Sequence, residues 1–478
     1  MTAIDPTPKR PPAYAPTDER YWDPVDLDQE IHRIFDVCHS CRMCLSYCPS
    51  FPDLFARIDG YIGKGEARGA ETLDAADLGS VVDNCYQCKL CYIKCPYTED
   101  EGHPWLLDFP RIALREKAQR ARRDGVTLQD RVLGEPQVLG ELTVGPQARI
   151  ANFVNANSLV RKGIEKTLGI SAKFPLPQFA SESFAVWWHR TRGDGSTREG
   201  VDESAGEVAL FTTCYGEYNS TGPAIAAVEV LEAHGYKVHY VEGQTCCGMP
   251  NLDGGDVPRA QEKAKQNVDA LLPHVRKGRK IVSPGPTCSY TLSHEYPDLL
   301  GTDEAREVAA ATMDLMRFID LELRRKKKLN KGVTTPLGKV AVQAPCHLRA
   351  QKIGVPSTQV LEALGAEVEV VQECSAVDGT WGMKAQHYET GRKYAQKLIR
   401  GMRESEADLY VTDCPLSALR IAHETGKPCV HPIEAIAKAY GLGEKGVPAG
   451  AHESPKGARG ADAKAGKKPK AKHPEADR

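Results

Sequence analysis

The fold of this chain is decided by the run Cys38-His-Ser-Cys41-Arg-Met-Cys44-Leu-Ser-Tyr-Cys48-Pro49, whose spacing returns in Cys85-Tyr-Gln-Cys88-Lys-Leu-Cys91-Tyr-Ile-Lys-Cys95-Pro96. Two residues between successive thiols allow one short loop to surround one face of a cuboidal cluster. The proline after each run turns the chain, so the fourth thiol points away from its own loop. This is the spacing of bacterial two-cluster ferredoxins, in which the fourth cysteine ligates the other cluster.

The spacing predicts two [4Fe–4S] clusters with exchanged fourth ligands. The first would be held by Cys38, Cys41, Cys44 and Cys95, and the second by Cys85, Cys88, Cys91 and Cys48. The alternative is tetrahedral zinc on the Cys-x2-Cys pairs, but zinc sites rarely use three evenly spaced cysteines with a fourth before proline. The segment between the two runs is longer than in a compact ferredoxin and consists mostly of helix formers, which predicts a helical ferredoxin domain.

Composition narrows the class of protein. The chain has 478 residues, which predicts two to four domains, and its net charge of −2 argues against nucleic acid as a partner. No apolar run is long enough to span a bilayer, and the N-terminal residues do not resemble a signal peptide. All of the 16 cysteines except Cys429 fall into groups with metal-ligand spacing or repeat symmetry, which indicates metal coordination in a reducing compartment. We expect a cytoplasmic protein, with a peripheral position on the cytoplasmic face of a membrane as the alternative.

An internal repeat occupies the second half of the chain. Gly206-Glu-Val-Ala-Leu leads to Cys214, and Gly338-Lys-Val-Ala-Val leads to Cys346 at the same distance. In each copy a helical stretch and an alternating strand follow, and a later strand runs into Cys288 or Cys414. Strand, helix and strand at this spacing predict a parallel α/β unit, with the cysteines at the carboxyl ends of the strands, where ligands gather.

These patterns divide the chain into six expected parts. They are an irregular N-terminal arm (1–27), a helical ferredoxin-type domain with two [4Fe–4S] clusters (28–120), a helical connector (121–204), a first α/β repeat (205–330), a second, degenerate α/β repeat (336–445) and a disordered basic tail (446–478). The predicted fold class is therefore mixed, with an α-helical domain followed by two α/β repeats with parallel strands.

The first repeat resembles the cysteine-rich CCG domain of the heterodisulfide reductase family, through Cys246-Cys247-Gly248 in TCCGMPNLDGGD. The whole layout is similar to the iron–sulfur subunits of anaerobic glycerol-3-phosphate dehydrogenase, glycolate oxidase and lactate-utilisation complexes. The resemblance implies a third iron–sulfur cluster on Cys214, Cys246, Cys247 and Cys288. A fifth cysteine that the family often has would fall at Thr291, and its absence argues against a cluster of the disulfide-cleaving type.

The second repeat departs further from the family pattern. Ser375 and Ala376 replace the paired cysteine and the glycine, and Ser417 stands at another cysteine position. Cys346, Cys374 and Cys414 remain. They would form a partial metal site completed by Asp378, Ser375 or His347 and holding a fourth cluster, or a relict site that binds nothing. Trp381, Met383 and Cys429 are expected to be packing residues.

The resemblance predicts an electron-transfer subunit rather than the substrate-oxidising enzyme. No flavin, nicotinamide or P-loop motif is present, so a flavoprotein dehydrogenase partner is expected, with quinone or a membrane-bound acceptor on the other side. The alternatives are a thiol–disulfide reductase acting at the CCG cluster and a redox sensor. The direction of electron flow stays open.

Overall fold

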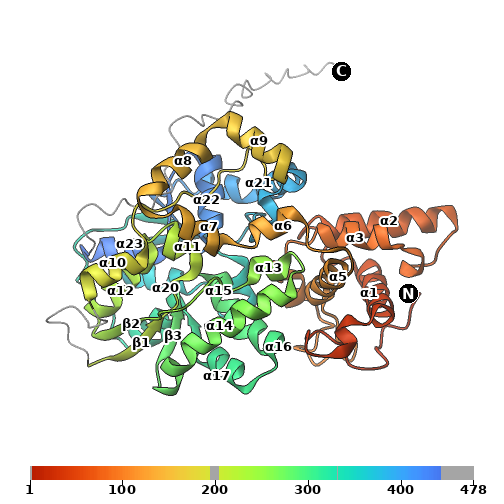
Figure 1. The fold of residues 1–478 in the computed structure, drawn as a ribbon, viewed down its shortest axis with the longest axis horizontal. Helices are drawn as coiled ribbons and strands as arrows, with labels where there is room; N and C mark the ends of the chain where they lie inside the picture. The colour runs from red at the N-terminus through yellow and green to blue at the C-terminus, as the bar shows by residue number, and fades with distance from the viewer. Residues whose placement is uncertain (1–2, 194–203, 331, 443–478) are drawn as a thin grey trace, which may run out of the picture.

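The computed structural model describes residues 3–193, 204–330 and 332–442. A helical N-terminal region forms one end of the molecule, and two four-stranded parallel sheets form the other (Figure 1). This is the predicted fold class. The predicted disorder of the C-terminal tail concerns residues that lie outside the described ranges.

The N-terminal region is built from helices, and residues 3–193, as far as the structure describes them, contain no strand. Its elements are η1 (Glu19–Trp22), α1 (Pro24–Cys41), α2 (Ser50–Lys64), η2 (Ala70–Thr72), α3 (Ala75–Asp83), α4 (Leu90–Lys94) and α5 (Phe109–Asp124). Helix α1 begins where Asp23 accepts hydrogen bonds from the N–H groups of Val25 and Asp26, as an N-cap residue does. Its last turn carries Cys38 and Cys41, so the start of the first cysteine run is anchored on a helix.

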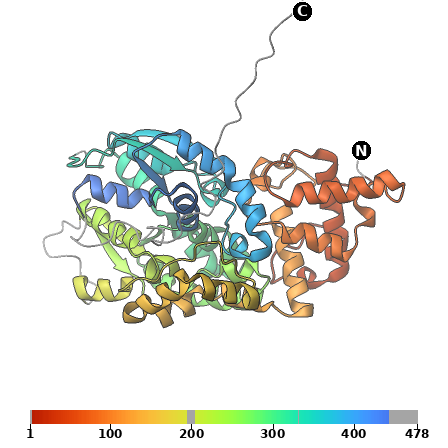
Figure 2. The same cartoon turned by 90° about the horizontal axis from the view of Figure 1, so that it is seen from above.

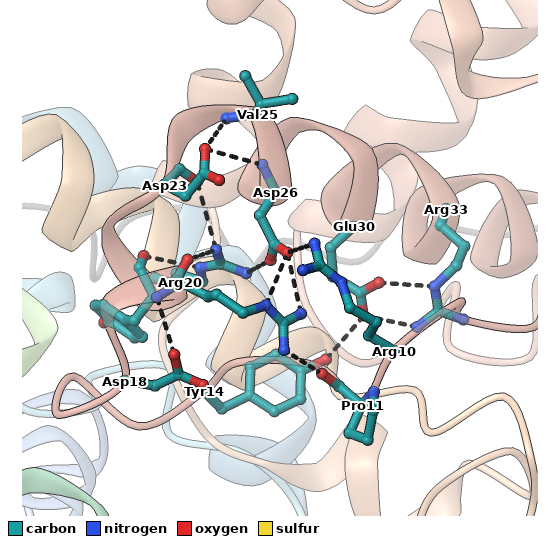
Figure 3. Close-up of polar contacts among 12 residues, drawn as sticks. Arg10, Pro11, Tyr14, Asp18, Arg20, Asp23, Val25, Asp26, Glu30 and Arg33 are labelled. Carbon is teal, nitrogen blue, oxygen red and sulfur yellow. Dashed lines mark hydrogen bonds and ion pairs between the residues drawn. The ribbon is translucent and has the colours of Figure 1, made fainter.

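Residues before α1 are held against the helical region by charged groups (Figure 3). Asp26 forms one ion pair with Arg20 and another with Arg115, each at 3.0 Å, and the side chain of Arg115 is fully buried. Beside them, the hydroxyl of Tyr14 donates to Glu30 at 3.3 Å, and Glu30 pairs with Arg33 at 2.6 Å. Because α1 already begins at Pro24, the arm is shorter than the predicted 1–27.

A set of connector helices follows. They are α6 (Leu128–Leu133), α7 (Pro136–Thr143), η3 (Gly145–Gln147), α8 (Ala148–Ala156), α9 (Ser158–Leu168) and α10 (Phe184–Arg192). Seen from above in Figure 2, these helices run from the N-terminal region along the body that holds the sheets. The connector is therefore packed structure rather than a loose linker.

The first α/β lobe has the strand order β2-β1-β3-β4, all parallel. Its strands are β1 (Gly206–Leu210), β2 (Tyr236–Tyr240), β3 (Lys280–Ser283) and β4 (Thr312–Asp314). Its helices are α11 (Thr213–Tyr218), α12 (Gly222–Ala233), α13 (Met249–Asp253), α14 (Val257–Arg276), α15 (Pro286–Tyr290), the π-helical turn η4 (Thr291–Glu295), α16 (Tyr296–Leu300), α17 (Asp303–Ala311), α18 (Leu315–Ile319) and the π-helical turn η5 (Asp320–Arg324).

The second lobe repeats this topology with the order β6-β5-β7-β8. Its strands are β5 (Lys339–Gln343), β6 (Glu367–Val371), β7 (Leu409–Thr412) and β8 (Cys429–Val430). Its helices are α19 (Cys346–Ala350), α20 (Pro356–Ala363), η6 (Trp381–Met383), η7 (Ala385–His387), α21 (Tyr388–Glu404), α22 (Pro415–Thr425) and α23 (Pro432–Ala439). The predicted repeat is confirmed, and each sheet gains a short fourth strand that the sequence pattern did not predict.

The two lobes share one apolar core. Val208 and Leu210 of β1 and Val340 and Val342 of β5 belong to the same buried cluster. Helix α12 packs on α23, and α18 packs on α20. Because α12 corresponds to α20 and α18 to α23 in the repeat, the lobes face each other as two-fold related copies. The carboxyl ends of both sheets can therefore present their cysteines to one region.

Candidate metal centres

The first predicted ligand set comes together at the end of α1. Burial raises the pKa of Cys38 well above its usual value, and the neighbouring thiols Cys44, Cys95 and Cys41 raise it further. The pKa of Cys44 rises to about 12 through burial and through Cys95 and Cys41. All four thiols are therefore mutual neighbours, and Cys95 has left its own run to join them. The grouping is that expected from the spacing, and ligation itself stays a prediction.

The second set gathers in the same way around α4. Burial raises the pKa of Cys91 well above its usual value, with added contributions from Cys88, Cys48 and Cys85. Burial and Cys85 raise the pKa of Cys48 to about 12, although hydrogen bonds from Ser50 and Phe51 oppose the shift. Cys48 thus lies with the second run. Cys44 also acts on Cys91, so the two thiol groups are adjacent.

The loops that carry these thiols adopt unusual backbone conformations. Arg42, Gln87 and Lys89 have φ values of 53°, 52° and 61°, in the left-handed region that non-glycine residues rarely enter. The side-chain amide of Gln87 donates to Cys85 Sγ at 3.3 Å. Left-handed backbone of this kind can form a concave loop whose N–H groups bind an anion, as a loop around an anionic cluster requires.

The predicted ligands of the first CCG site also converge. Hydrogen bonds from the thiols of Cys214 and Cys247 hold the pKa of Cys246 well below its usual value, and the Lys263 ammonium adds to this shift. Cys247 in turn interacts with Cys288. Gly248 follows with φ 87°, and a Cβ there would lie 3.3 Å from the carbonyl oxygen of Ala260, so this position requires glycine.

Strand register corrects one interpretation from the sequence. Val208 of β1 pairs with Lys280, and Val340 of β5 pairs with Leu409, which makes Ser283 equivalent to Thr412. Counting on from these strand ends, Cys288 is equivalent to Ser417 and Gly285 to Cys414. Gly285 therefore occupies the position of the cysteine that the first lobe lacks, and a Cβ there would lie 3.5 Å from Cys288 Sγ. The assignment of that position to Thr291 was wrong. Each lobe keeps a different member of this Cys-x2-Cys pair.

The three cysteines of the second lobe lie together and beside the second ferredoxin-type set. After burial and Asp378, the thiols Cys88, Cys374 and Cys414 raise the pKa of Cys346. The Cys374 thiol donates to the hydroxyl of Tyr86 at 3.8 Å, and Tyr86 donates to the carbonyl of Tyr47 at 2.8 Å. Ser375 and Ser417, at the two lost cysteine positions, hydrogen bond to each other at 2.9 Å.

Short helices connect the thiol groups in series. Helix α4 carries Cys91 and contacts α19, which begins at Cys346, and α19 contacts α15, which carries Cys288. His347 on α19 joins the second thiol loop to α15, because its Nε2–H donates to the carbonyl of Gln87 at 3.0 Å and its Nδ1 accepts from Thr287 at 2.9 Å. Burial lowers the pKa of His347 to about 4, consistent with this neutral tautomer.

A stack of aromatic rings leads outward from His347. Its ring lies 5.2 Å from that of Tyr290 at an angle of 14°, and Tyr290 lies 4.6 Å from His294 at 3°. Tyr290 and His294 line a cavity of about 410 Å³, together with Tyr14, Tyr92 and Gln351. The cavity lies where the N-terminal region meets both lobes.

Buried lysines stand next to the thiol groups, and the sequence analysis did not identify them. Lys117 pairs with Asp253 at 3.0 Å and donates to the carbonyl of Cys85 at 3.3 Å. Lys89 pairs with Glu295 at 3.1 Å, with both side chains almost fully buried. Nothing in the local sequence marks these lysines, because their burial depends on contacts between distant segments. Trp381, which donates to the carbonyl of Asp83 at 2.7 Å, Met383 and Cys429 are buried, as predicted.

The donor sets fit iron–sulfur clusters. None of the 16 cysteines forms a disulfide. Packing several buried thiols together raises most of their pKa values, because the thiolate form is unfavourable without a nearby positive charge. A bound metal supplies that charge and replaces the protons. Thiolates are soft ligands that favour iron–sulfur clusters, and each ferredoxin-type set supplies the four that a [4Fe–4S] cluster needs. Among the described residues, no helix is long and apolar enough to cross a membrane.

Comparison with known proteins agrees with this arrangement. The profile of the 4Fe-4S dicluster domain matches residues 34–121, and that of the cysteine-rich domain CCG matches residues 208–293 and 340–420. One subunit of the anaerobic glycerol-3-phosphate dehydrogenase of Escherichia coli (strain K12) is 28% identical over 419 residues, which cover 85% of this chain and 98% of that protein. Lactate utilization protein A of Bacillus thuringiensis (strain Al Hakam) is 30% identical over 188 residues, 37% of this chain and 75% of that protein. Lactate utilization protein A 2 of Bacillus mycoides (strain KBAB4) is 28% identical over 219 residues, 44% of this chain and 87% of that protein.

Proposed function

The chain belongs to the CCG-domain proteins and carries a 4Fe-4S dicluster domain ahead of its two CCG domains, and from this premise we propose that it is an electron-transfer subunit of an oxidoreductase complex. It would relay electrons between a flavoprotein dehydrogenase and quinone or another acceptor. The observation that carries the proposal is the series of contacts from α4 through α19 to α15. Through these helices the thiol groups of all three domains become neighbours.

The chain's own residues would set the electrostatics of the route. When bound, [4Fe–4S] clusters supply reversible one-electron transfer. Although each is paired with a carboxylate, Lys117 and Lys89 both oppose the rise that burial causes in the pKa of Cys85, which favours the anionic ligand state. His347 and Tyr86 fix the second CCG site against the dicluster domain by hydrogen bonds. Burial keeps water from these groups.

A partner would dock at the first thiol set. Met43 and Leu45 flank Cys44 and are 54% and 51% exposed, although they are large apolar side chains. Exposed apolar residues next to a redox centre are typical of a docking surface for a redox partner. The relative named as part of a dehydrogenase supports a multi-subunit assembly. The unpaired cysteines support a cytoplasmic location, at the membrane surface if the acceptor is there.

The acceptor would bind in the cavity lined by Tyr290 and His294. Its volume of about 410 Å³ is within the range of small-molecule sites. Each cation at its wall has a carboxylate partner, since Lys89 pairs with Glu295 at 3.1 Å, Lys352 with Asp100 at 2.9 Å and Arg111 with Asp298 at 2.5 Å. Such a wall favours a neutral planar molecule, such as a quinone ring, over an anion.

The proposal is tested by purification of the tagged full-length chain under anaerobic conditions from its own cells. A flavoprotein should co-purify, measured as flavin released per chain. M43E/L45E should reduce the flavin ratio at least tenfold while iron content stays unchanged. V186E is the control, because Val186 is equally exposed at 55% but lies on α10, outside the thiol loops. Absence of flavin, or an equal loss in the control, would refute the proposed partner.

A further inference from the structure

The second CCG site has three thiols and lacks the fourth ligand that a cubane cluster needs. Cys346, Cys374 and Cys414 come from the carboxyl ends of β5, β6 and β7. The sequence offers three side chains that could complete the site, namely His347, Ser375 and Asp378. The hydrogen bonds of these three side chains separate the candidates.

Two of the candidates already use their ligand atoms. Both ring nitrogens of His347 are engaged, Nε2 with Gln87 at 3.0 Å and Nδ1 with Thr287 at 2.9 Å. The hydroxyl of Ser375 accepts from Ser417 at 2.9 Å. Binding iron through His347 would break contacts that hold the second lobe to the first lobe and to the dicluster domain, and binding iron through Ser375 would disturb a hydrogen bond within the second lobe.

Asp378 is different. Its Oδ2 is buried and has no hydrogen-bond partner among the described residues. A buried carboxylate oxygen without a partner is costly and calls for an explanation. A ligand atom from Cys346, His347 and Asp378 each lies within 4.8 Å of the other two. Asp378 also contributes to the raised pKa of all three thiols of the site.

The backbone holds the Asp378 carboxylate in this place. Asp378 has φ 27° and Ala376 has φ 48°, both in the left-handed region that costs energy for residues with a Cβ. Gly382 allows the loop to close, because a Cβ there would lie 2.6 Å from the carbonyl oxygen of Ala376. Strain of this kind persists where the surroundings fix a functional geometry.

Charged groups around Asp378 do not neutralise it by contact. Burial raises the pKa of Asp378 most, Asp253 raises it further, and Lys89 and Lys117 oppose the shift from a distance. Each of those lysines has its own carboxylate partner, Glu295 or Asp253. Asp378 therefore lacks a counterion of its own, and a metal would supply one.

We propose that Asp378 is the fourth ligand of a [4Fe–4S] cluster in the second CCG site, beside Cys346, Cys374 and Cys414. This inference rests on the proposed function only in taking the thiol sets to hold iron–sulfur clusters. A carboxylate is a harder and weaker ligand for such iron than thiolate. The iron that Asp378 binds is accordingly the one that is lost or exchanged first.

The test measures iron, acid-labile sulfide and EPR spectra of the full chain, reconstituted anaerobically. D378A should lose about one iron per chain without loss of sulfide and should show a [3Fe–4S] signal when oxidised. D378C should keep all its iron, with one altered component in the EPR spectrum of the reduced protein. D413N is the matched control, since Asp413 has a buried oxygen without a partner but accepts from Ser357 at 3.1 Å, and it should resemble wild type.

The inference is overturned if D378A and D378C both have wild-type iron, sulfide and spectra, or if D413N changes them equally. If D378A does not fold, D378C alone decides, because its spectrum either changes or stays the same. C374S separates the two proposals. If C374S contains as much iron per chain as wild type, and that amount is about eight or more, the second site is empty. This inference then fails while the electron-transfer proposal stands.

Discussion

The buried ion pair between Lys117 and Asp253 should hold the dicluster domain to the first CCG lobe. Lys117 lies on α5 and Asp253 ends α13, their charged atoms are 3.0 Å apart, and the side chains are only 10% and 8% exposed. Lys117→Met leaves the Asp253 carboxylate buried without its counterion. Breaking one side of such a pair costs about 3–5 kcal/mol.

A double-mutant cycle measures this cost. Replacing both residues, Lys117→Met with Asp253→Leu, removes both buried charges and should recover all but about 1–2 kcal/mol. The assay is anaerobic urea unfolding, followed by the visible absorption of the clusters. K173M is the control, because Lys173 and Glu389 form an ion pair that is 66% and 63% exposed, and it should not shift the midpoint. An equal shift for K117M and K173M, or no rescue in the double variant, would refute the reasoning.

Two further substitutions test local features. Gly248→Ala places a Cβ 3.3 Å from the Ala260 carbonyl oxygen at φ 87°, so it should cost about 1–2 kcal/mol of stability and remove iron from the first CCG site, as measured by iron counting. Gly243→Ala is the control, because Gly243 has a similar φ of 78° but no neighbour within 4 Å, and this variant should keep that iron. Burial raises the pKa of Glu434 to about 7 from 4.5, so the folded state loses stability as pH rises through this interval. Glu434→Gln should remove this loss, stabilising the protein by up to about 3 kcal/mol at pH 8 and leaving it unchanged near pH 4, as read from urea midpoints; equal effects at both pH values would count against a raised pKa.

The parts of the fold that local patterns encode were predictable. The cysteine spacing predicted the dicluster domain, and the matched strands Gly206–Leu210 and Lys339–Gln343 predicted the parallel repeat. Strands β4 and β8 were missed because three and two residues are too short to show an alternating pattern. Cys288 was aligned wrongly because it is the fifth residue after the end of β3, whereas Cys414 is the second residue after the end of β7.

The relation between the sites depends on contacts that no local pattern reports. The Tyr86 hydroxyl and the Cys374 thiol meet across 288 positions of sequence, and His347 reaches Gln87 across 260. Burial of Lys117 likewise needs α5 to pack against α13. The sequence identified the chemistry of the cysteines, and the neighbouring charges and hydrogen bonds became visible only in the folded chain.

The exchange of fourth ligands between the two thiol runs is tested most directly by iron counting in paired serine variants. Cys41→Ser and Cys95→Ser should each cost about four iron per chain, and the two together should cost no more than about four, because both residues serve one cluster. Cys41→Ser with Cys48→Ser should cost about eight. A loss of about eight iron when Cys41 and Cys95 are replaced together would contradict the account.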